Sequence, residues 1–576
     1  MTYDIAFTTN KLDLFPILDI NTSLISRGTH KGKGFSPADI IADFSFNAAG
    51  STFDGYDIDK LTFNSHAADR TMNLKIEGVS DKLTTLISGD ISFDKDTIPS
   101  FNLVGQLKNL NLAKFLKDEK YESNFNFYLS ANGRNFNPDE LTATFNIGID
   151  SSRFLGERIS NSDIQCTFKK DSTKREILLT SDFADFQIDG NFALSKAVEL
   201  VSYESKTISE IISAKINELN PLSIVQPRTG EDSTKTSLPV IVNENLKFNF
   251  GCTFKDLELL SKLIGYDRLD LSGDFNGNIK NESGNFSVTT ELNLDYFIMM
   301  QNARTIYLSD FNATLNFTRD NRSLSFDKLF GTASLTGKRF YSGSNVKSIE
   351  ADVAFNQSKL FFSTSANIAD MFTTEAEGII LMTPREQQLL VDKLSLSYEW
   401  IEWTNKDTMK VLFNPDYFKV VQFQMKKDTS LISLSGIIQS SGKQDLTLTA
   451  DRISGNILER YMFVLKDNQL IANGSATAKV EGEIANPIFN LSLQLKDVKL
   501  PSTPRANIQG SLYYSDKKLI TNFTFLDSTS NENNPLFSMD GTLPVDLSFA
   551  TVKERILQNE PLSIQIKSSR FNLSSL

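Results

Sequence analysis

The sequence predicts a mostly β protein, in which a long, curved antiparallel sheet forms an extended apolar groove and a few short helices accompany it. Three observations predict this fold class. Apolar and polar residues alternate with a period of two along the whole chain. Short turns rich in Asn, Asp and Gly separate the alternating segments, and a Gly recurs inside the segments in similar surroundings. Helical periodicity is confined to a few stretches.

The alternation is clearest in 141–150, where every odd position is apolar and every even position is polar or Gly. Because successive side chains of a strand point to opposite faces, such a segment predicts a strand with one apolar and one polar face. One-sided strands are typical of antiparallel sheets, since buried parallel strands read as continuous apolar runs. The same pattern recurs in 246–254, 286–294, 311–318 and 489–496.

A Gly flanked closely by apolar residues recurs inside the predicted strands. A Gly in a strand marks a bulge, a sharp twist or the close approach of another backbone. The repetition therefore predicts one curved sheet module that is used many times, although no fixed period emerges. The five positions are Gly89, Gly190, Gly273, Gly436 and Gly510.

The clearest helix is predicted near 194–219, where apolar residues fall at helical spacing and Asn220-Pro221 ends the pattern. A polar stretch without periodicity predicts a mobile polar loop over 226–239. This loop divides the chain into a first β-groove array, 1–225, and a second, 240–576. Shorter helices are predicted at 111–119, 256–264 and 547–557.

The composition argues against several classes of function. With 71 acidic and 59 basic residues the net charge is −12, which disfavours nucleic-acid binding. The chain has only two Cys and two His, scattered too widely to predict a zinc site. No phosphate-binding Gly loop or nucleophile elbow occurs. We expect no catalytic residue, no metal and no cofactor, and therefore not an enzyme; whether Cys166 and Cys252 meet stays open.

Both Trp residues lie in 398–403, within the run Tyr-Glu-Trp-Ile-Glu-Trp. A partner-binding patch is one interpretation of this run. Aromatic packing at a junction of the sheet is the interpretation that we favour, because large aromatic side chains dominate buried cores.

Apolar stripes on so many strands must be shielded from water by another part of the protein or by a ligand. A sandwich or barrel would bury them against another sheet, whereas an open, curved sheet would line a groove for acyl chains. Moving a lipid with roughly 30 methylenes through water costs on the order of 20 kcal/mol, which a continuous apolar trough removes. The sequence does not decide which alternating face lines the groove. The residues expected to line it are Phe145, Ile147, Phe248, Phe250, Phe286, Leu292, Phe317, Phe489, Leu491 and Leu493.

The first residues lack the basic and apolar regions of a signal peptide, and no run of 18 apolar residues occurs. Both ends of the sequence fall within alternating patterns. We therefore expect a segment of a longer chain, whose targeting signals and membrane contact lie outside it.

Several short motifs resemble the TamB family of translocation and assembly proteins, within the wider AsmA-like group. The most telling is the Gly-Thr-Leu-Pro-Val-Asp-Leu-Ser run at 541–548. The resemblance extends to 482–489 and 510–514, and more distantly to 137–142 and to 181–185 with 190–192. It is diffuse but covers most of the chain, and none of these motifs is catalytic.

The resemblance implies a protein that is anchored in the inner membrane and crosses the periplasm as a long β-groove. Family members are linked to phospholipid transport toward the outer membrane and to outer-membrane protein assembly with a barrel partner. The function expected for this chain is a periplasmic section of such a bridge, with phospholipid acyl chains as ligands and an outer-membrane β-barrel assembly protein as a further partner. The alternative is a structural or adhesive protein of stacked β-sandwiches, whose apolar faces bury one another.

Overall fold

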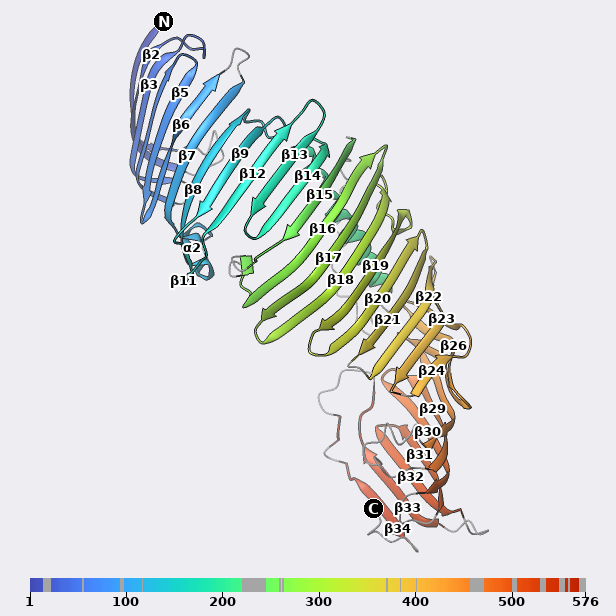
Figure 1. Cartoon of the computed structure of the whole chain (residues 1–576). Coiled ribbons are helices and arrows are strands. Elements are labelled where there is room, and N and C mark those ends of the chain that lie inside the picture. The colour runs from blue at the N-terminus through green and yellow to red at the C-terminus, as the bar shows by residue number, and fades with distance from the viewer. Residues whose placement is uncertain are drawn as a thin grey trace. The chain divides into compact units, whose positions relative to one another are not determined.

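The computed structural model of the chain consists mainly of antiparallel strands (Figure 1). In its described part it holds 34 strands and two α-helices, α2 (Leu112–Leu116) and α3 (Leu194–Leu219), so the predicted long antiparallel sheet with few helices is confirmed. The predicted helix near 194–219 has the bounds of α3, and α2 lies within the predicted 111–119. The structure describes residues 1–13, 22–53, 56–93, 98–116, 118–219, 245–257, 260–261, 264–368, 371–383, 385–399, 401–455, 471–499, 505–528, 535–548, 555–557 and 560–568.

The chain divides into two compact units. Unit 1 comprises Met1–Ser205, Ile241–Arg322 and Thr336–Gly343. Unit 2 comprises Lys206–Val240, Ser323–Leu335 and Ser344–Leu576. The predicted loop 226–239 lies outside the described residues, as does most of the predicted helix at 547–557.

In unit 1 the strands pair antiparallel in chain order from β1 to β9 and then from β12 to β18. The hairpin of β10 and β11 branches off and pairs with β8. The ladder continues from β14 to β15, which are far apart in the sequence. The bounds are β1 (Thr2–Leu12), β2 (Thr22–Lys33), β3 (Ile41–Phe53), β4 (Tyr56–Ala68), β5 (Thr71–Ser80), β6 (Leu83–Phe93), β7 (Pro99–Leu110), β8 (Ser123–Arg134), β9 (Thr142–Ile149), β10 (Arg153–Phe154), β11 (Glu157–Arg158), β12 (Ser162–Lys170), β13 (Arg175–Ser181), β14 (Ala184–Asn191), β15 (Leu246–Phe254), β16 (Arg268–Glu282), β17 (Asn285–Gln301) and β18 (Arg304–Asp320).

Unit 2 repeats the same arrangement, with strands pairing antiparallel in chain order from β20 to β23 and from β25 to β34. The short strands β24 and β25 act as one strand that is interrupted at 406–408. Both pair with β23 on one side and with β26 on the other. The bounds are β19 (Leu329–Tyr341), which has residues in both units, β20 (Asn345–Asn356), β21 (Lys359–Ile368), β22 (Phe372–Met382), β23 (Gln387–Tyr398), β24 (Ile401–Asn405), β25 (Met409–Asn414), β26 (Tyr417–Lys427), β27 (Ser430–Gln439), β28 (Lys443–Ser454), β29 (Ile471–Glu483), β30 (Asn486–Lys499), β31 (Ala506–Ser515), β32 (Lys518–Asp527), β33 (Pro535–Pro544) and β34 (Ser563–Ser568).

Four of the five recurring glycines share one backbone geometry. Gly89, Gly190, Gly273 and Gly436 have φ values of +154°, +154°, +149° and +127°, which side chains with a Cβ rarely adopt. A Cβ built at any of them would lie 2.0 to 2.3 Å from a carbonyl oxygen of the neighbouring strand. The close backbone approach expected from the sequence is therefore the reason for these four glycines. Gly510 differs, because a phenyl ring and not a backbone approaches it.

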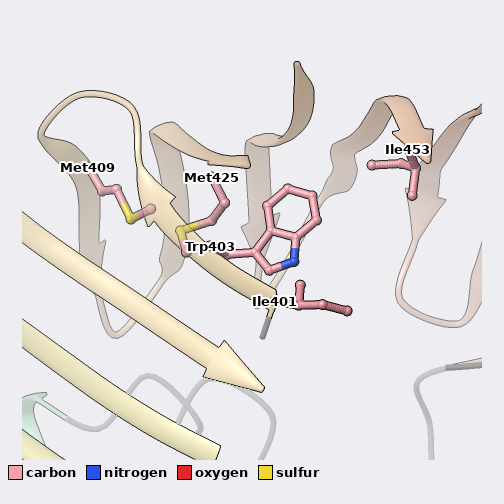
Figure 2. Packing of buried hydrophobic residues seen from close by; sticks show 5 residues of the cluster. All are labelled: Ile401, Trp403, Met409, Met425 and Ile453. Carbon is pink, nitrogen blue, oxygen red and sulfur yellow. The ribbon is translucent and has the colours of Figure 1, made fainter. Parts of the chain in front are cut away.

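The buried clusters of the sheet are small. In unit 2, Trp403 packs in a cluster with Ile401, Met409, Met425 and Ile453, and Figure 2 shows the two Met side chains converging from neighbouring strands beside the indole. Ile401 is completely buried and Trp403 nearly so. This packing agrees with the interpretation of 398–403 as a junction within the sheet, although Trp400 itself lies outside the described residues.

Candidate functional site

One face of the unit 1 sheet carries rows of apolar side chains that run from strand to strand. The pairing registers place the members of one such row directly opposite one another, from β9 to β18. Every one of them is half-buried. The row consists of Phe145, Cys166, Leu179, Phe186, Cys252, Phe275, Leu292 and Ala313.

Half-burial of this row shows that its apolar face is open in the described part of unit 1. In a sandwich, a second sheet packs about 10 Å away and the facing side chains interdigitate to exclude water. Large apolar residues in mid-strand would then be buried, as in a protein core. Phe145, Leu179 and Phe275 instead retain contact with solvent although neighbouring strands flank them on both sides.

The opposite face of the same strands is polar. There Gln165 Nε2 donates to Asn146 Oδ1 at 2.8 Å, and Asn146 Nδ2 donates to Ser130 Oγ at 3.1 Å. Farther along, Thr253 Oγ1 donates to Asp274 Oδ1 at 2.6 Å. These groups satisfy one another across exposed strands, which is typical of a solvated face.

Phenyl rings lie over glycines on the apolar face of both units. Phe7, Phe250, Phe362 and Phe523 each stand opposite a Gly in the pairing register, and a Cβ at that Gly would lie within 3 Å of the ring. The ring thus covers the space that the Gly leaves free, an arrangement known to compensate for Gly in strands. The glycines are Gly28, Gly277, Gly378 and Gly510, in the same order.

The two rims of this apolar face are covered while its middle is open. At one rim, Phe154 and Ile159, from the hairpin segment, pack on Phe125 and Ile149 in a buried cluster. At the other, Phe101 is buried in a cluster with Ala131 and Ala143, and its ring stacks on Phe136 at a centroid distance of 4.9 Å. We call this face of unit 1 the trough: its middle rows, which are half-buried, are the floor, and the buried clusters near the strand ends are the rims.

Helix α3 builds part of the second rim. Its Glu204 forms a bidentate ion pair with Arg319 of β18, with Oε1 2.7 Å from Nη2 and Oε2 2.9 Å from Nε. Both side chains are buried, and desolvation raises the pKa of Glu204 against the opposing effect of Arg319. Arg319 lies opposite Phe286 in the register, hence on the apolar face. The helix therefore rests on the apolar face at the ends of the strands.

The structure places all seven unit 1 residues that were expected to line the groove on this one face. They differ in exposure. Phe145, Ile147, Phe250 and Leu292 retain contact with solvent on the open floor. Phe248, Phe286 and Phe317 are only 3 to 4% exposed, in the two rows next to the rim where α3 rests.

The three unit 2 residues, Phe489, Leu491 and Leu493, share the apolar face of β30 and are half-buried. Leu491 belongs to a row whose member Leu448 is 43% exposed. The floor of unit 2 is closed where the cluster around Trp403 fills it. The Leu491 row consists of Leu434, Leu448, Ala478, Leu491 and Leu512.

Reasoning from the sequence missed α3 as a rim element and missed its ion pair with Arg319. A signal was present, because Glu204 falls at helical spacing with Ala197, Leu200 and Ile211 and interrupts an otherwise apolar face. A charge in that position predicts a buried partner. Nothing in the local sequence pattern indicates that Arg319 is that partner.

Within the described ranges, no group of three His, Cys, Asp or Glu is arranged as metal ligands. Burial raises the pKa of the Cys166 and Cys252 thiols, which makes them poorer nucleophiles. His66 and Asp43 form an exposed pair at 2.7 Å. No described helix is long and apolar enough to cross a bilayer.

The open apolar trough is thus the feature of this molecule to which a function can be attached. No family model, no curated protein and no solved structure matches the chain, so the argument for its function rests on the trough and on the motifs of the sequence.

Proposed function

We propose that this chain is a section of a bridge that conducts phospholipids along an apolar β-groove between two membranes. The observation that carries the proposal is the row of half-buried apolar residues from Phe145 to Ala313, which crosses strand after strand on an uncovered face. No chemical step is needed for this function, because the trough acts by replacing water around the acyl chains.

The dimensions of the row suit an acyl chain. From β9 to β18 the row crosses seven strand spacings, or about 34 Å at about 4.8 Å each. The hydrocarbon core of a bilayer is about 30 Å thick, so one leaflet's chains extend over roughly half of that. Each methylene kept from water contributes about 0.8 kcal/mol. A lipid could therefore lie with its chains wholly on the floor and its headgroup in water.

The cellular setting follows from the resemblance to the TamB family. We propose a periplasmic location, anchorage to the inner membrane through segments outside this sequence, and cooperation with an outer-membrane β-barrel assembly protein. The Gly-Thr-Leu-Pro-Val-Asp-Leu-Ser run at 541–548 is the main support for this part of the proposal.

A structural or adhesive protein of stacked sandwiches is the competing proposal. It requires that the apolar faces bury one another. The cluster of Ile401, Trp403 and Met409 fits that requirement locally in unit 2. The half-buried floor of unit 1 does not fit it, and we therefore favour transport.

Lipid bound to the gently purified chain, identified by solvent extraction and native mass spectrometry, tests the proposal. We expect co-purifying phospholipid, and we expect Phe145→Asp or Leu493→Asp to abolish it by placing a charge on the floor. The matched controls are Asn146→Asp and Gln494→Asp, one residue along on the exposed polar face, which should leave lipid binding unchanged. A lipid-free wild-type protein, or equal binding by floor and control variants, would refute the proposal.

A further inference from the structure

The surface of α3 is divided into three arcs. One arc is buried and holds Ala197, Leu200 and Glu204, with Thr207 and Ile211 farther along the helix, and Glu204 contacts the sheet through Arg319. A second arc is apolar and exposed: Val198, Val201, Ile212 and Ile216 are 62, 40, 38 and 59% exposed. The third arc is exposed and polar, with Glu199, Ser202, Lys206 and Glu210.

The exposed apolar arc needs an explanation. A helix that rests on a sheet normally presents one apolar stripe to the sheet and a polar surface to water. In α3 a second apolar stripe adjoins the first, about a quarter turn away at 100° per residue. Val198 and Val201, three residues apart, adjoin each other on this arc, and exposed apolar side chains that adjoin one another mark a site of interaction.

The contacts of α3 fix its course along one rim of the trough. At its beginning, the backbone N–H and hydroxyl of Ser195 donate to the carboxylate of Asp139, in the turn between β8 and β9, at 2.8 and 2.7 Å. Farther on, Glu204 binds Arg319 at the end of β18. Both sheet partners lie at the same ends of the strands. The helix therefore runs along the rim, in the direction from β9 toward β18.

The hydrogen-bond pattern decides which way the exposed apolar arc points. Asn321 N–H donates to Gly284 O, so in the β17–β18 ladder the apolar-face pairs, such as Phe286 with Arg319, are the hydrogen-bonded ones. Consider a strand of L-residues that runs upward. A residue of this strand whose side chain points toward the viewer has its N–H and C=O groups pointing to the right. When the apolar face is toward the viewer and β17 runs upward, β18 therefore lies to the right of β17. Because β18 is antiparallel to β17, its end with Arg319 is at the bottom. Helix α3 runs along this lower rim from left to right.

A right-handed helix turns clockwise when it is viewed from its N-terminus. The exposed apolar arc is about a quarter turn clockwise from the arc that faces the sheet. In the orientation just given, it therefore points upward, over the open floor that begins at Phe250 and Leu315. The polar arc points outward, away from the trough.

We infer that the unit 1 part of α3, up to Ser205, is a side wall of the trough and that Val198 and Val201 contact the acyl chains of phospholipids lying on the adjacent floor. This inference rests on the proposed function. Acyl chains are the occupant that the chemistry favours, because the wall residues Val198 and Val201 and the floor residues Phe250 and Leu315 form one apolar corner. Between Leu194 and Ser205, the charge of Glu204 is paired with Arg319 beneath the helix, and Lys196 pairs with Glu199 of the outward arc.

Photo-crosslinking in the full chain tests this assignment. A p-benzoylphenylalanine residue is introduced by Val201→p-benzoylphenylalanine on the wall, by Ser202→p-benzoylphenylalanine on the outward arc, and by Phe145→p-benzoylphenylalanine on the floor. Each variant is incubated with vesicles of phosphatidylethanolamine and phosphatidylglycerol, irradiated, and analysed by intact-protein mass spectrometry. All three positions retain contact with solvent, so the label is tolerated.

We expect the mass of one phospholipid to be added at positions 201 and 145, with a yield at position 201 at least about tenfold that at position 202. Equal yields at 201 and 202, or labelling at 145 without labelling at 201, would overturn the wall assignment and leave the proposed function standing. Absence of labelling at all three positions would overturn both.

Discussion

The ion pair between Glu204 and Arg319 offers the sharpest test of how α3 is held in place. The side chains of Arg319 and Glu204 are excluded from water, at 0% and 2% exposure, and they share two charge-assisted hydrogen bonds. Replacing Arg319 by Met keeps the volume similar but leaves a buried carboxylate without its partner. Removing one member of a buried pair costs about 3–5 kcal/mol. The cost should be concentrated in α3, because Glu204 reaches the sheet from this helix.

Hydrogen exchange of α3 amides, followed by mass spectrometry, measures this cost. At about 1.4 kcal/mol per tenfold, a loss of about 3–5 kcal/mol accelerates local opening by about 10² to 4 × 10³-fold. The double substitution Glu204→Met with Arg319→Met should restore most of the protection, since a buried pair can be replaced by apolar residues with little loss. Unchanged exchange in Arg319→Met would refute the buried, structural role of the pair.

The pH dependence of stability should distinguish Arg319→Met from Glu204→Gln. The folded pKa of Glu204 is already raised by desolvation, and losing Arg319 removes the interaction that lowers it. A raised carboxyl pKa gives stability that is present below the unfolded value, about 4.3, and is lost as pH rises through the folded value. The deficit of Arg319→Met should therefore shrink in acid. Glu204→Gln, which removes the charge opposite Arg319 together with the titrating carboxyl, should show a deficit that does not change over the same range.

Three further predictions concern the sheet. Gly89→Ala places a Cβ 2.0 Å from Asn102 O, whereas a Cβ at Gly156, which also has a positive φ, would meet nothing within 4 Å. Chemical denaturation should therefore show Gly89→Ala to be less stable than Gly156→Ala by about 2 kcal/mol or more. Cys166 and Cys252 lie three strands apart in one row, about 14 Å, which is too far for a disulfide bond. Protein that is denatured without reducing agent should therefore show two thiols in a thiol-reagent assay, and finding none would contradict the register. The native thiols should react slowly at pH 7 and faster at higher pH, because burial raises the pKa of both. The Ser548 N–H and Lys517 lower the pKa of Asp546 to about 2. Hydrogen-exchange protection of residues 546–548 should therefore hold at pH 5 and be lost as the pH falls from about 4 to 2. Asp546→Asn should remove this pH-dependent loss of protection.

The period-two alternation was sufficient to place side chains on faces. Phe145, Cys252 and Leu292, far apart in the sequence, lie in one row because each sits on the apolar side of its own strand. The alternation could not show what covers that side. Phe248, Phe286 and Phe317 have the same local pattern as Phe145, yet they lie buried at the rim where α3 rests.

The recurring glycines show a similar limit. Gly89 and Gly510 have almost the same neighbours in sequence, but only Gly89 has a positive φ with a backbone pressed against it. At Gly510 the ring of Phe523, on the next strand, takes the space. Such differences depend on the cross-strand partner, and the register that selects the partner is a property of the folded sheet.

The chain-order pairing of the strands also bears on how the molecule reaches its native state. From β1 to β9, each new strand needs only the strand before it as a template, so contacts form between segments that are close in sequence. Folds dominated by such local contacts fold faster than β-sandwiches, whose partners are distant. A nascent chain could extend its sheet one hairpin at a time while later strands are still being made. The exception is the step from β14 to β15, which are separated by 54 residues, 192–245, including α3, so the loss of chain entropy on pairing is larger there and folding should pause.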